Sequence, residues 1–434
     1  MCKKFFSIVF IFIVISSCSN KNEIIVEDSE SGFSILSYDS KVSETLSLDI
    51  SKIIISDPIE FYYWSKNFQN VRNNLGNIKT SSSIKNRKQI INGNGNVSNI
   101  IQPIYFDNSL CHINSNGFLA CVDVNTKEQI FEIDTKPEGI KKLEVIRGGL
   151  AYFDENIVYV DVFGQIFLIN SQNGEIKWTN KIDFPILSSP LIYRDLIYFI
   201  SSDNRIFAIN LNDGTIKWTF QTTSENKKYV NTSSPSAFEN LIIVPFSNGE
   251  LIAFKYDDGR PLWSENISKV SLVSNFDIKD ISANPVVNSN SVYTISTNGK
   301  LVSTNIINGE RNWSVNLSGS RTPLISGNVL YIVDEDSRLI CLSLDTGEIY
   351  WITQLEKFRK GNKVKDLNLW LSPVLINNLL YIFSFFGESM VISPITGEIL
   401  TQEKIGVKGI ISQPLILNDS VYVADENSNV FEIR

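Results

Sequence analysis

The feature that most constrains the fold is a repeat in which a proline and a glycine are 24 residues apart; five units keep both residues. Two units nearer the N-terminus, starting at Pro103 and Leu150, keep the same distance with substitutions, and Pro414 starts one further unit. The chain of 434 residues therefore contains eight repeat starts at periods of 38 to 50 residues, a range typical of propellers and other arrays. Five proline–glycine pairs are 24 residues apart: Pro190 and Gly214, Pro235 and Gly259, Pro285 and Gly309, Pro323 and Gly347, Pro373 and Gly397. In the first four of these units a tryptophan follows the glycine by four residues, at Trp218, Trp263, Trp313 and Trp351.

Each unit predicts four short strands separated by turn residues. In the third unit the strands cover about 188–193, 196–201, 205–210 and 215–220. The middle strands are apolar on both faces, so each sheet has to be covered on both sides. Four-stranded antiparallel sheets that pack face to face around an axis meet this requirement, and the sequence therefore predicts an all-β, eight-bladed β-propeller. We interpret the tryptophan on the outermost strand as a residue that packs against the neighbouring blade.

The last unit indicates how the ring closes. From Pro414 the sequence supports three strands, at about 413–417, 420–424 and 429–433, and the glycine and tryptophan positions would fall beyond Arg434. An unpaired strand edge is an aggregation liability. The strand-like stretch 84–92 lies just before the first unit, so we expect the final blade to take its outer strand from there.

The N-terminal region predicts an exported protein with a lipid anchor. Lys3 and Lys4 precede an apolar run, Phe5 to Ile15, that has the organisation of a secretory signal and is too short to span a bilayer. Ile15-Ser16-Ser17-Cys18 resembles the lipobox of bacterial lipoproteins, in which the cysteine is lipidated and becomes the first residue. We expect a signal peptide over 1–17, lipidation of Cys18, a lipid-proximal tether over 18–60 and the propeller over 61–434.

Charge and composition exclude several classes of function. Without the signal peptide the net charge would be about −10, which is a poor match for nucleic acid or anionic headgroups. His112 is the only histidine, and this excludes a histidine-based catalytic triad and a multi-histidine metal site. Asp334-Glu335-Asp336 occupies the same inter-strand turn as Ser202-Asp203-Asn204, which favours a solvated turn over a cation site. We expect no cofactor and no metal.

Two cysteines raise the question of a disulfide. Cys111 and Cys121 would face each other across a hairpin if Ser115-Asn116-Gly117 forms a three-residue loop, and a disulfide could then form in an oxidising compartment. The position of Cys121 is filled in other units by Ala208, Ala253 and Cys341. This comparison favours a small buried position over a disulfide.

Length variation is confined to the connectors between each tryptophan and the next proline. All connectors leave the same face of the disc, where a repeat protein carries its binding loops. The long connectors, which we expect to form the binding surface, are 132–149, 219–234, 264–284 and 352–372.

The unit that ends in Asp345-Thr-Gly-Glu-Ile-Tyr-Trp351 resembles the tryptophan-motif repeat of the quinoprotein propellers. One branch of that superfamily comprises quinone-dependent dehydrogenases, which carry an adjacent cysteine pair and calcium-binding acids, and no two cysteines are adjacent here. The other branch is the family of BamB, a lipoprotein of the outer-membrane β-barrel assembly machinery. The lipobox, the eight units, the closing strand and the stretches 298–313 and 327–339 are similar to this branch.

The resemblance to the BamB family implies a non-catalytic scaffold at the periplasmic face of the outer membrane. Its partners would be BamA, other subunits of the machinery and outer-membrane protein clients. Contacts in the family come from two connectors, which implies partner-binding roles here for Asp280 and Ser282 in one connector and for Lys228 and Tyr229 in the other. The alternative readings are a quinone-dependent or glycan-active propeller enzyme, or a propeller lipoprotein that binds another envelope ligand.

Overall fold

The computed structural model describes residues 48–84, 86–93, 98–141, 143–223, 233–268, 280–359 and 366–434. Within these ranges the repeat units form eight antiparallel sheets, one for each unit, and each strand pairs with the strand that follows it in the unit. The first strand of each unit is the inner one and the fourth is the outer one. The sequence-derived prediction of an eight-bladed propeller is confirmed.

The first four blades come from the first four units and contain four strands each. Blade 1 contains β5 (Ile104–Phe106), β6 (Ser109–Ile113), β7 (Phe118–Asp123) and β8 (Gln129–Asp134). Blade 2 contains β10 (Gly148–Phe153), β11 (Asn156–Asp161), β12 (Gln165–Asn170) and β13 (Ile176–Lys181). Blade 3 contains β14 (Leu191–Tyr193), β15 (Leu196–Ser201), β16 (Arg205–Asn210) and β17 (Ile216–Gln221). Blade 4 contains β18 (Ser236–Phe238), β19 (Leu241–Pro245), β20 (Glu250–Lys255) and β21 (Pro261–Asn266).

Blades 5 and 6 are built in the same way, whereas blades 7 and 8 recruit strands from the N-terminal side of the chain. Blade 5 contains β22 (Val286–Asn288), β23 (Ser291–Ile295), β24 (Leu301–Asn305) and β25 (Arg311–Val315). Blade 6 contains β26 (Leu324–Ser326), β27 (Val329–Val333), β28 (Arg338–Ser343) and β29 (Ile349–Gln354). Blade 7 contains β30 (Val374–Ile376), β31 (Leu379–Phe383), β32 (Glu388–Ile392) and β33 (Ile399–Lys404), extended on its inner side by β2 (Asn77–Lys79) and β1 (Ile59–Glu60). Blade 8 contains β34 (Leu415–Ile416), β35 (Val421–Ala424), β36 (Val430–Ile433) and β3 (Arg87–Ile91).

Three small elements complete the described fold. A 3-10 turn, η1 (Ile50–Lys52), precedes β1. β4 (Ser98–Asn99), which follows β3 in the chain, pairs in parallel with β9 (Val145–Ile146), which directly precedes blade 2.

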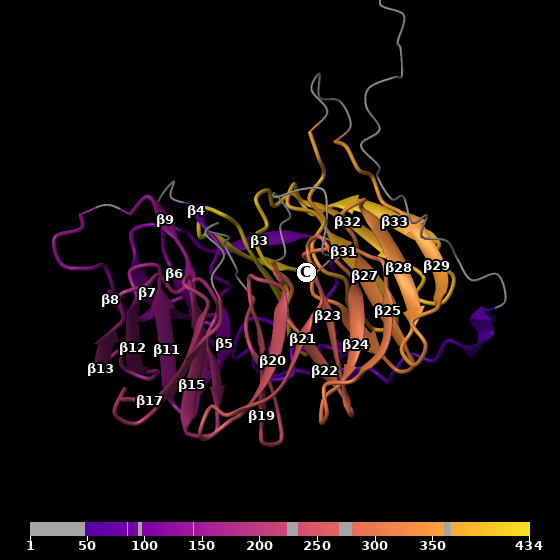
Figure 1. Cartoon of the computed structure of the whole chain (residues 1–434). Coiled ribbons are helices and arrows are strands. Elements are labelled where there is room, and N and C mark those ends of the chain that lie inside the picture. Colours follow the sequence, from indigo (N-terminus) through magenta and orange to yellow (C-terminus); the bar gives the residue numbers. More distant parts are fainter. Residues whose placement is uncertain are drawn as a thin grey trace, which may run out of the picture. The chain divides into compact units, whose positions relative to one another are not determined.

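Strand β3 closes the ring as the sequence predicts. It pairs antiparallel with β36, with Arg87 opposite Ile433 and Gln89 opposite Phe431. In Figure 1 the purple β3 lies beside the yellow C-terminal strands. Buried apolar clusters join successive blades, and one large cluster combines blades 6, 7 and 8 with Tyr105 and Leu110 of blade 1. The hydrophobic core is therefore continuous from the last blade to the first.

A repeated aromatic–glycine pair packs one blade on the next. Trp263 on β21 lies against Gly309 of blade 5, and its Nε1 donates to the carbonyl of Ile306 over 2.9 Å. Gly309 has φ +74°, and a Cβ at this position would lie 2.6 Å from Cγ of Trp263. The glycine thus has two functions, because it allows the left-handed turn and leaves room for the ring. The other pairs are Phe131 and Gly174, Trp178 and Gly214, Trp218 and Gly259, Trp313 and Gly347, Trp351 and Gly397.

Residues 48–82, called here the N-terminal segment, run across the inner strands of the blades. In Figure 1 this indigo stretch follows the lower end of the sheets. Its backbone forms hydrogen bonds or bridges with seven of the eight blades, at the inner strands or at the turns that follow them. These contacts include Trp64 with Tyr105, Lys66 with Ala151, Val71 with Ala237, Arg72 with Val287, Ile54 with Asn328, Ile78 with Ile376 and Phe61 with Asn418.

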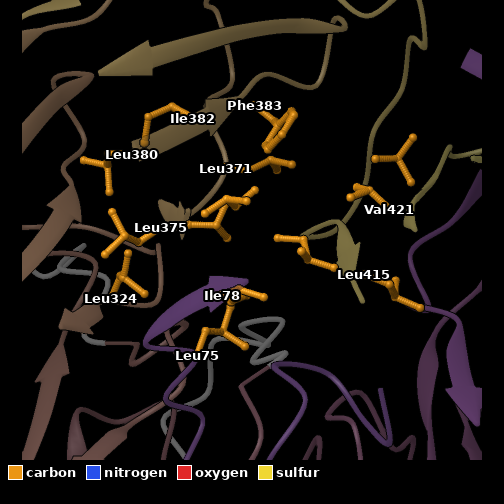
Figure 2. Packing of buried hydrophobic residues seen from close by; sticks show 14 of the residues in the cluster. Leu75, Ile78, Leu324, Leu371, Leu375, Leu380, Ile382, Phe383, Leu415 and Val421 are labelled. Carbon is orange, nitrogen blue, oxygen red and sulfur yellow. The ribbon is translucent and has the colours of Figure 1, made fainter. Parts of the chain in front are cut away.

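The N-terminal segment also contributes to the apolar core. Figure 2 shows Leu75 and Ile78 of this segment facing Leu324, Leu375 and other side chains of blades 6 and 7. Ile78 is completely buried. Lys66 is buried too, and its Nζ donates to Asn73 Oδ1 over 2.6 Å and to the carbonyl of Asn67 over 2.8 Å. Burial lowers the pKa of Lys66 to about 7.

The structure corrects the interpretation of the two cysteines in blade 1. Cys111 on β6 and Cys121 on β7 are direct cross-strand partners, and their sulfur atoms are bonded. The comparison with Ala208 and Ala253 identified the position as small and buried, which is correct, but it could not show that blade 1 has a second cysteine directly opposite. Cys341 occupies the same position in blade 6, opposite Tyr331, and is a free buried thiol.

Candidate partner-binding face

The connectors and one set of turns lie at the same end of the sheets. Because the strands of each blade alternate in direction, the turn between the second and third strands emerges beside the connector to the next blade. Bridges between the two confirm this arrangement: Ile186 pairs with Ser201, Trp370 with Ser384 and Ile410 with Asp425. We call this end, formed by the connectors and these turns, the connector face.

Buried polar residues directly before the inner strands tie the connectors to one another. The backbone N–H of Ser234 donates to Asn284 Oδ1 over 2.6 Å, and the N–H of Asn284 donates to Thr322 Oγ1 over 3.1 Å. Each of these residues precedes the proline that starts a unit. The same position supplies two further links, from Ser234 Oγ to the carbonyl of Ser189 over 2.9 Å and from Gln102 Nε2 to the carbonyl of Gln413 over 2.7 Å. The bases of these connectors are therefore fixed.

Asp280 and Ser282 lie in the connector that leads into blade 5. Asp280 Oδ2 accepts a hydrogen bond of 2.6 Å from Ser282 Oγ, and the carbonyl of Asp280 accepts one of 2.9 Å from the backbone N–H of Thr297. Ser282 Oγ also lies 3.3 Å from Thr297 Oγ1. The two candidate residues thus contact each other and the second-to-third strand turn of their own blade.

The carboxyl of Asp280 is less accessible to solvent than the carboxyl of an acidic residue on a contact surface would be. Its side chain is 4% exposed, and Oδ1 has no hydrogen-bond partner among the described residues. Burial raises the pKa of Asp280 to about 6, and the hydrogen bond from Ser282 opposes this rise. In this conformation Asp280 orders the base of the connector.

The other site residues expected from the sequence lie outside the described residues. Lys228 and Tyr229 fall in the range 224–232, and Cys18 falls in the range 1–47. For the part of the chain that the structure describes, we find no helix long and apolar enough to cross a membrane.

The acidic turn of blade 6 is held by cations of the protein itself. Asp334 Oδ2 lies 2.6 Å from a terminal guanidinium nitrogen (Nη2) of Arg338, and Asp336 lies 2.9 Å from Nζ of Lys357. Across the described ranges, no group of three or more His, Cys, Asp or Glu residues is arranged to hold a metal ion. Two of the three carboxylates of this turn are thus paired with cations of the protein itself.

A β-hairpin in the connector between blades 6 and 7 is a surface feature that sequence analysis missed. Phe358 bridges Leu367, and Leu367 and Leu369 are 53% and 44% exposed. The signal was present in the alternation of Leu367-Asn368-Leu369-Trp370, which is a strand pattern inside an expected loop. Isolated leucines on a surface are common, but this group is contiguous with the partly buried Phe385, whose N–H donates to the carbonyl of Leu369 over 2.8 Å.

Comparison with solved structures first defines the class of protein. The fold is similar to that of a europium-containing methanol dehydrogenase, with a TM-score of 0.65 and 13% identity over 84% of this chain and 89% of that one. It is also similar to the crystal structure of BamB from Moraxella catarrhalis, with a TM-score of 0.67 and 17% identity over 81% of this chain and 99% of that one. These similarities define the class by its fold, an eight-bladed β-propeller.

Comparison of sequences then identifies the family within this class. The family profile described as outer membrane protein assembly factor BamB matches residues 115–353, which is more than half of the chain. The chain belongs to this family. A curated relative, the outer membrane protein assembly factor BamB of Yersinia pestis, is 22% identical over 344 residues, covering 78% of this chain and 85% of the relative.

Proposed function

We propose that this protein is a non-catalytic scaffold of outer-membrane protein assembly that binds BamA through its connector face. Membership of the assembly factor family is the observation that carries the proposal. The connector face supports it, because the connectors are the variable part of an otherwise regular repeat and their bases are held by the polar links between Ser234, Asn284 and Thr322. A rigid scaffold with variable connectors suits recognition of a partner.

The protein is anchored to the periplasmic face of the outer membrane by lipid on Cys18 after removal of residues 1–17. The tether that the sequence predicts over 18–60 is proposed to end before residue 48. Residues 48–60 already belong to the propeller surface, since Ile54 N–H donates to Asn328 Oδ1 over 2.8 Å and Ser56 N–H donates to Ser326 Oγ over 3.0 Å. Replacement of Cys18 by alanine should abolish acyl labelling and release the protein from the membrane fraction.

BamA capture from detergent-solubilised envelopes tests the partner. Recovery of the tagged full-length protein without BamA would contradict the proposal. The variant Asp280→Asn then separates two roles for this carboxyl, because it removes the charge and preserves the shape. If the charge contacts BamA, capture falls by about tenfold; if Asp280 only orders the connector, capture is retained. The matched control is Asp425→Asn on blade 8, another buried acid of the connector face.

A further inference from the structure

The first half of the N-terminal segment exposes apolar side chains that its packing on the blades does not require. Residues 48–64 bury Ile53 and Trp64 against the propeller. A segment that is covered on one side normally carries polar residues on the other side. Here the exposed side chains include five large apolar ones, with exposed fractions between 40% and 64%: Ile50, Ile54, Ile59, Tyr62 and Tyr63. We call these five residues the apolar sector.

The second half of the same segment provides an internal comparison. Residues 65–82 also run across the inner strands, but the side chains that they expose are those of Arg72, Lys79 and Ser81. Both halves are held by short backbone contacts with the blades. Packing on inner strands is therefore compatible with a polar outer surface. Single exposed apolar residues are common, but five within residues 50–63 form a group that needs an explanation.

The backbone contacts of the first half place the apolar sector at one end of the sheets. Ile54 N–H donates to Asn328 Oδ1 over 2.8 Å, and the carbonyl of Phe61 accepts a hydrogen bond of 2.9 Å from Asn418 N–H. Both asparagines lie in turns between the first and second strands, in blades 6 and 8. Because the strands alternate in direction, these turns emerge at the end opposite the connector face. We call this opposite end the turn face.

The first-to-second strand turns divide the turn face by charge. In blades 5, 6 and 7 these turns are uncharged: Ser289-Asn290, Gly327-Asn328 and Asn377-Asn378. The turn of blade 8 has one acid, Asp419. In blades 1 to 4 the turns contain five acids and one arginine: Asp107, Asp154, Glu155, Asp195, Glu239 and Arg194. The apolar sector thus lies over the part of the turn face whose inner turns carry the least charge.

This combination of side chains suits a lipid surface. Tyrosine has an apolar ring and a polar hydroxyl, and it is enriched where an apolar phase meets water. The uncharged turns of blades 5 to 7 offer nothing to attract a strongly charged partner, and the acids of blades 1 to 4 would be repelled by anionic headgroups. The outer turns of blades 6 and 7 carry Glu348 and Glu398, so the contact has to be shallow. A bilayer interface rich in zwitterionic headgroups meets these conditions.

The place where the described chain begins provides independent support. Residue 48 directly precedes the apolar sector, and the lipid expected on Cys18 lies 30 residues before it. A chain of that length spans at most about 100 Å even when it is fully extended. The anchor would therefore keep the sector near the bilayer. A contact made under such confinement needs little affinity of its own, and a second weak contact adds to a lipid anchor.

We propose that the apolar sector docks on the membrane interface, so that the propeller itself contacts the bilayer in addition to its lipid. The turn face then lies toward the membrane, and the connector face points away from it and is open to BamA. The inference rests on the lipidation of Cys18 proposed above, because the tether brings the sector to the membrane.

The test uses the lipidated full-length protein in vesicles of phosphatidylethanolamine with a minor fraction of phosphatidylglycerol. An environment-sensitive dye is attached to Asp57→Cys, within the apolar sector, or to Asn240→Cys, in the first-to-second strand turn of blade 4; both positions are exposed. Cys341 is a buried thiol and Cys111 is bonded to Cys121, so the introduced cysteine is the accessible thiol of the described residues. Nitroxide-labelled acyl chains quench the dye where it contacts lipid.

The dye at Asp57→Cys should be quenched at least threefold more than the dye at Asn240→Cys. Adding Tyr62→Ser/Tyr63→Ser to Asp57→Cys should reduce this quenching at least twofold, because two interfacial side chains are removed. This pair of reporters compares the two parts of one face in the same fold. An unchanged melting temperature of the tyrosine variant shows that the propeller is intact.

Phe153→Ser/Ile176→Ser is the matched control. Phe153 and Ile176 are 47% and 42% exposed, and they lie at the turn-face end of blade 2, beside the acidic turn Asp154-Glu155. This variant removes the same number of exposed apolar side chains from the other part of the turn face. Quenching of the dye at Asp57→Cys should therefore stay within 1.5-fold of its value without the control substitutions.

Three results would overturn the inference. The first is equal quenching at Asp57→Cys and Asn240→Cys. The second is quenching at Asp57→Cys that the tyrosine and control variants change equally or not at all. The third is a blue shift of the dye at Asp57→Cys that grows with protein concentration in detergent without vesicles, which would assign the apolar sector to contact with a second copy of the chain.

Acyl labelling of Cys18 in the same samples separates this inference from the anchor on which it rests. Labelled protein that floats with the vesicles but shows no preferential quenching at Asp57→Cys contradicts the docking alone. Protein without the label contradicts the proposed anchor, and the inference fails with it. BamA capture by the tyrosine variant should be retained, because the connector face lies at the opposite end of the sheets.

Discussion

The junctions between blades are of two kinds. From blade 1 to blade 7, each of the six junctions has an aromatic ring in one fixed position packed on a glycine of the next blade. The two junctions that flank blade 8 lack this pair, and Thr401 stands in the tryptophan position of blade 7. They use dispersed contacts instead: Tyr105 stacks on Tyr422 with ring centroids 5.8 Å apart, and Asn99 Nδ2 donates to Ser428 Oγ over 3.0 Å.

The difference shows how a repeat and its closure are stabilised. A single motif, copied six times, packs the repeated junctions mainly through apolar burial. The closing junctions join segments that are distant in sequence, and they combine a shared apolar cluster with individual polar contacts and with the N-terminal segment. We therefore expect substitutions at the repeated junctions to have large effects and substitutions at the closing junctions to have smaller ones.

The largest effect is expected from removal of a ring at a repeated junction. Trp263 is 9% exposed, and Trp263→Ala should lower the free energy of unfolding by about 3–5 kcal/mol, because it leaves a cavity and removes the hydrogen bond to Ile306. Denaturant unfolding followed by circular dichroism measures this change. An unaltered transition midpoint would show that the ring does not hold blades 4 and 5 together.

The glycine partner provides a sharper version of the same comparison. Gly309 and Gly406 have nearly equal dihedral angles, with φ +74° and +73°. A Cβ at Gly309 would lie 2.6 Å from Trp263, whereas at Gly406 the nearest atom is 3.3 Å away, in the flexible side chain of Arg87. Both alanine variants incur the left-handed backbone cost of about 1 kcal/mol. Gly309→Ala should lose about 1–2 kcal/mol more, and equal melting shifts would rule out the packing role of the glycine.

Much of this architecture could be predicted from sequence because the same residue spacing recurs in each repeated unit. The distance from proline to glycine set the number of blades, and the strand missing after Val430–Ile433 indicated 84–92 as its replacement. The sequence assigns 18–60 to a tether and does not predict the pairing of the N-terminal segment, since this segment pairs one or two residues at a time and has no strand period. The stacking of Tyr105 on Tyr422 could not be predicted from sequence for a similar reason, because it joins two positions that the repeat does not relate.

The candidate site was less predictable than the fold. Asp280 was implied by the family resemblance, but no motif marks its burial or its hydrogen bonds with Ser282 Oγ and the N–H of Thr297. The apolar hairpin at Leu367 and Leu369 had a readable alternation, yet the two-residue period was short and lay within a segment expected to be a loop. Such features depend on tertiary context more than on local pattern.

An effect of intermediate size is expected from the titration of a buried carboxyl in the repeated part of the ring, which makes the stability of the fold depend on pH. Asp161 of blade 2 is 3% exposed, and burial raises its pKa to about 6, against the hydrogen bonds from the N–H groups of Gln165 and Phe163. Well below pH 4 the carboxyl is protonated in both the folded and the unfolded state. As the pH rises from about 4 to above 6, the unfolded state ionises first and the folded state loses about 2 kcal/mol of stability.

The variant Asp161→Asn keeps an oxygen acceptor for both N–H groups and cannot ionise. Relative to wild type, it should gain about 2 kcal/mol of stability between pH 4 and pH 8. Paired denaturation curves at both pH values measure this gain. A stability difference that does not vary with pH would show that the carboxyl is not desolvated as the structure indicates.

The smallest effect is expected at a closing junction. Gln102→Ala removes the hydrogen bond to the carbonyl of Gln413 and should cost about 1–2 kcal/mol, because a buried acceptor then lacks its partner. Combined with Trp263→Ala, its effect should be additive within about 0.5 kcal/mol if the two junctions are independent. A double variant that loses markedly more than the sum would show that the ring responds as one cooperative unit. In that case the division between repeated and closing junctions would describe their contacts but not their energetics.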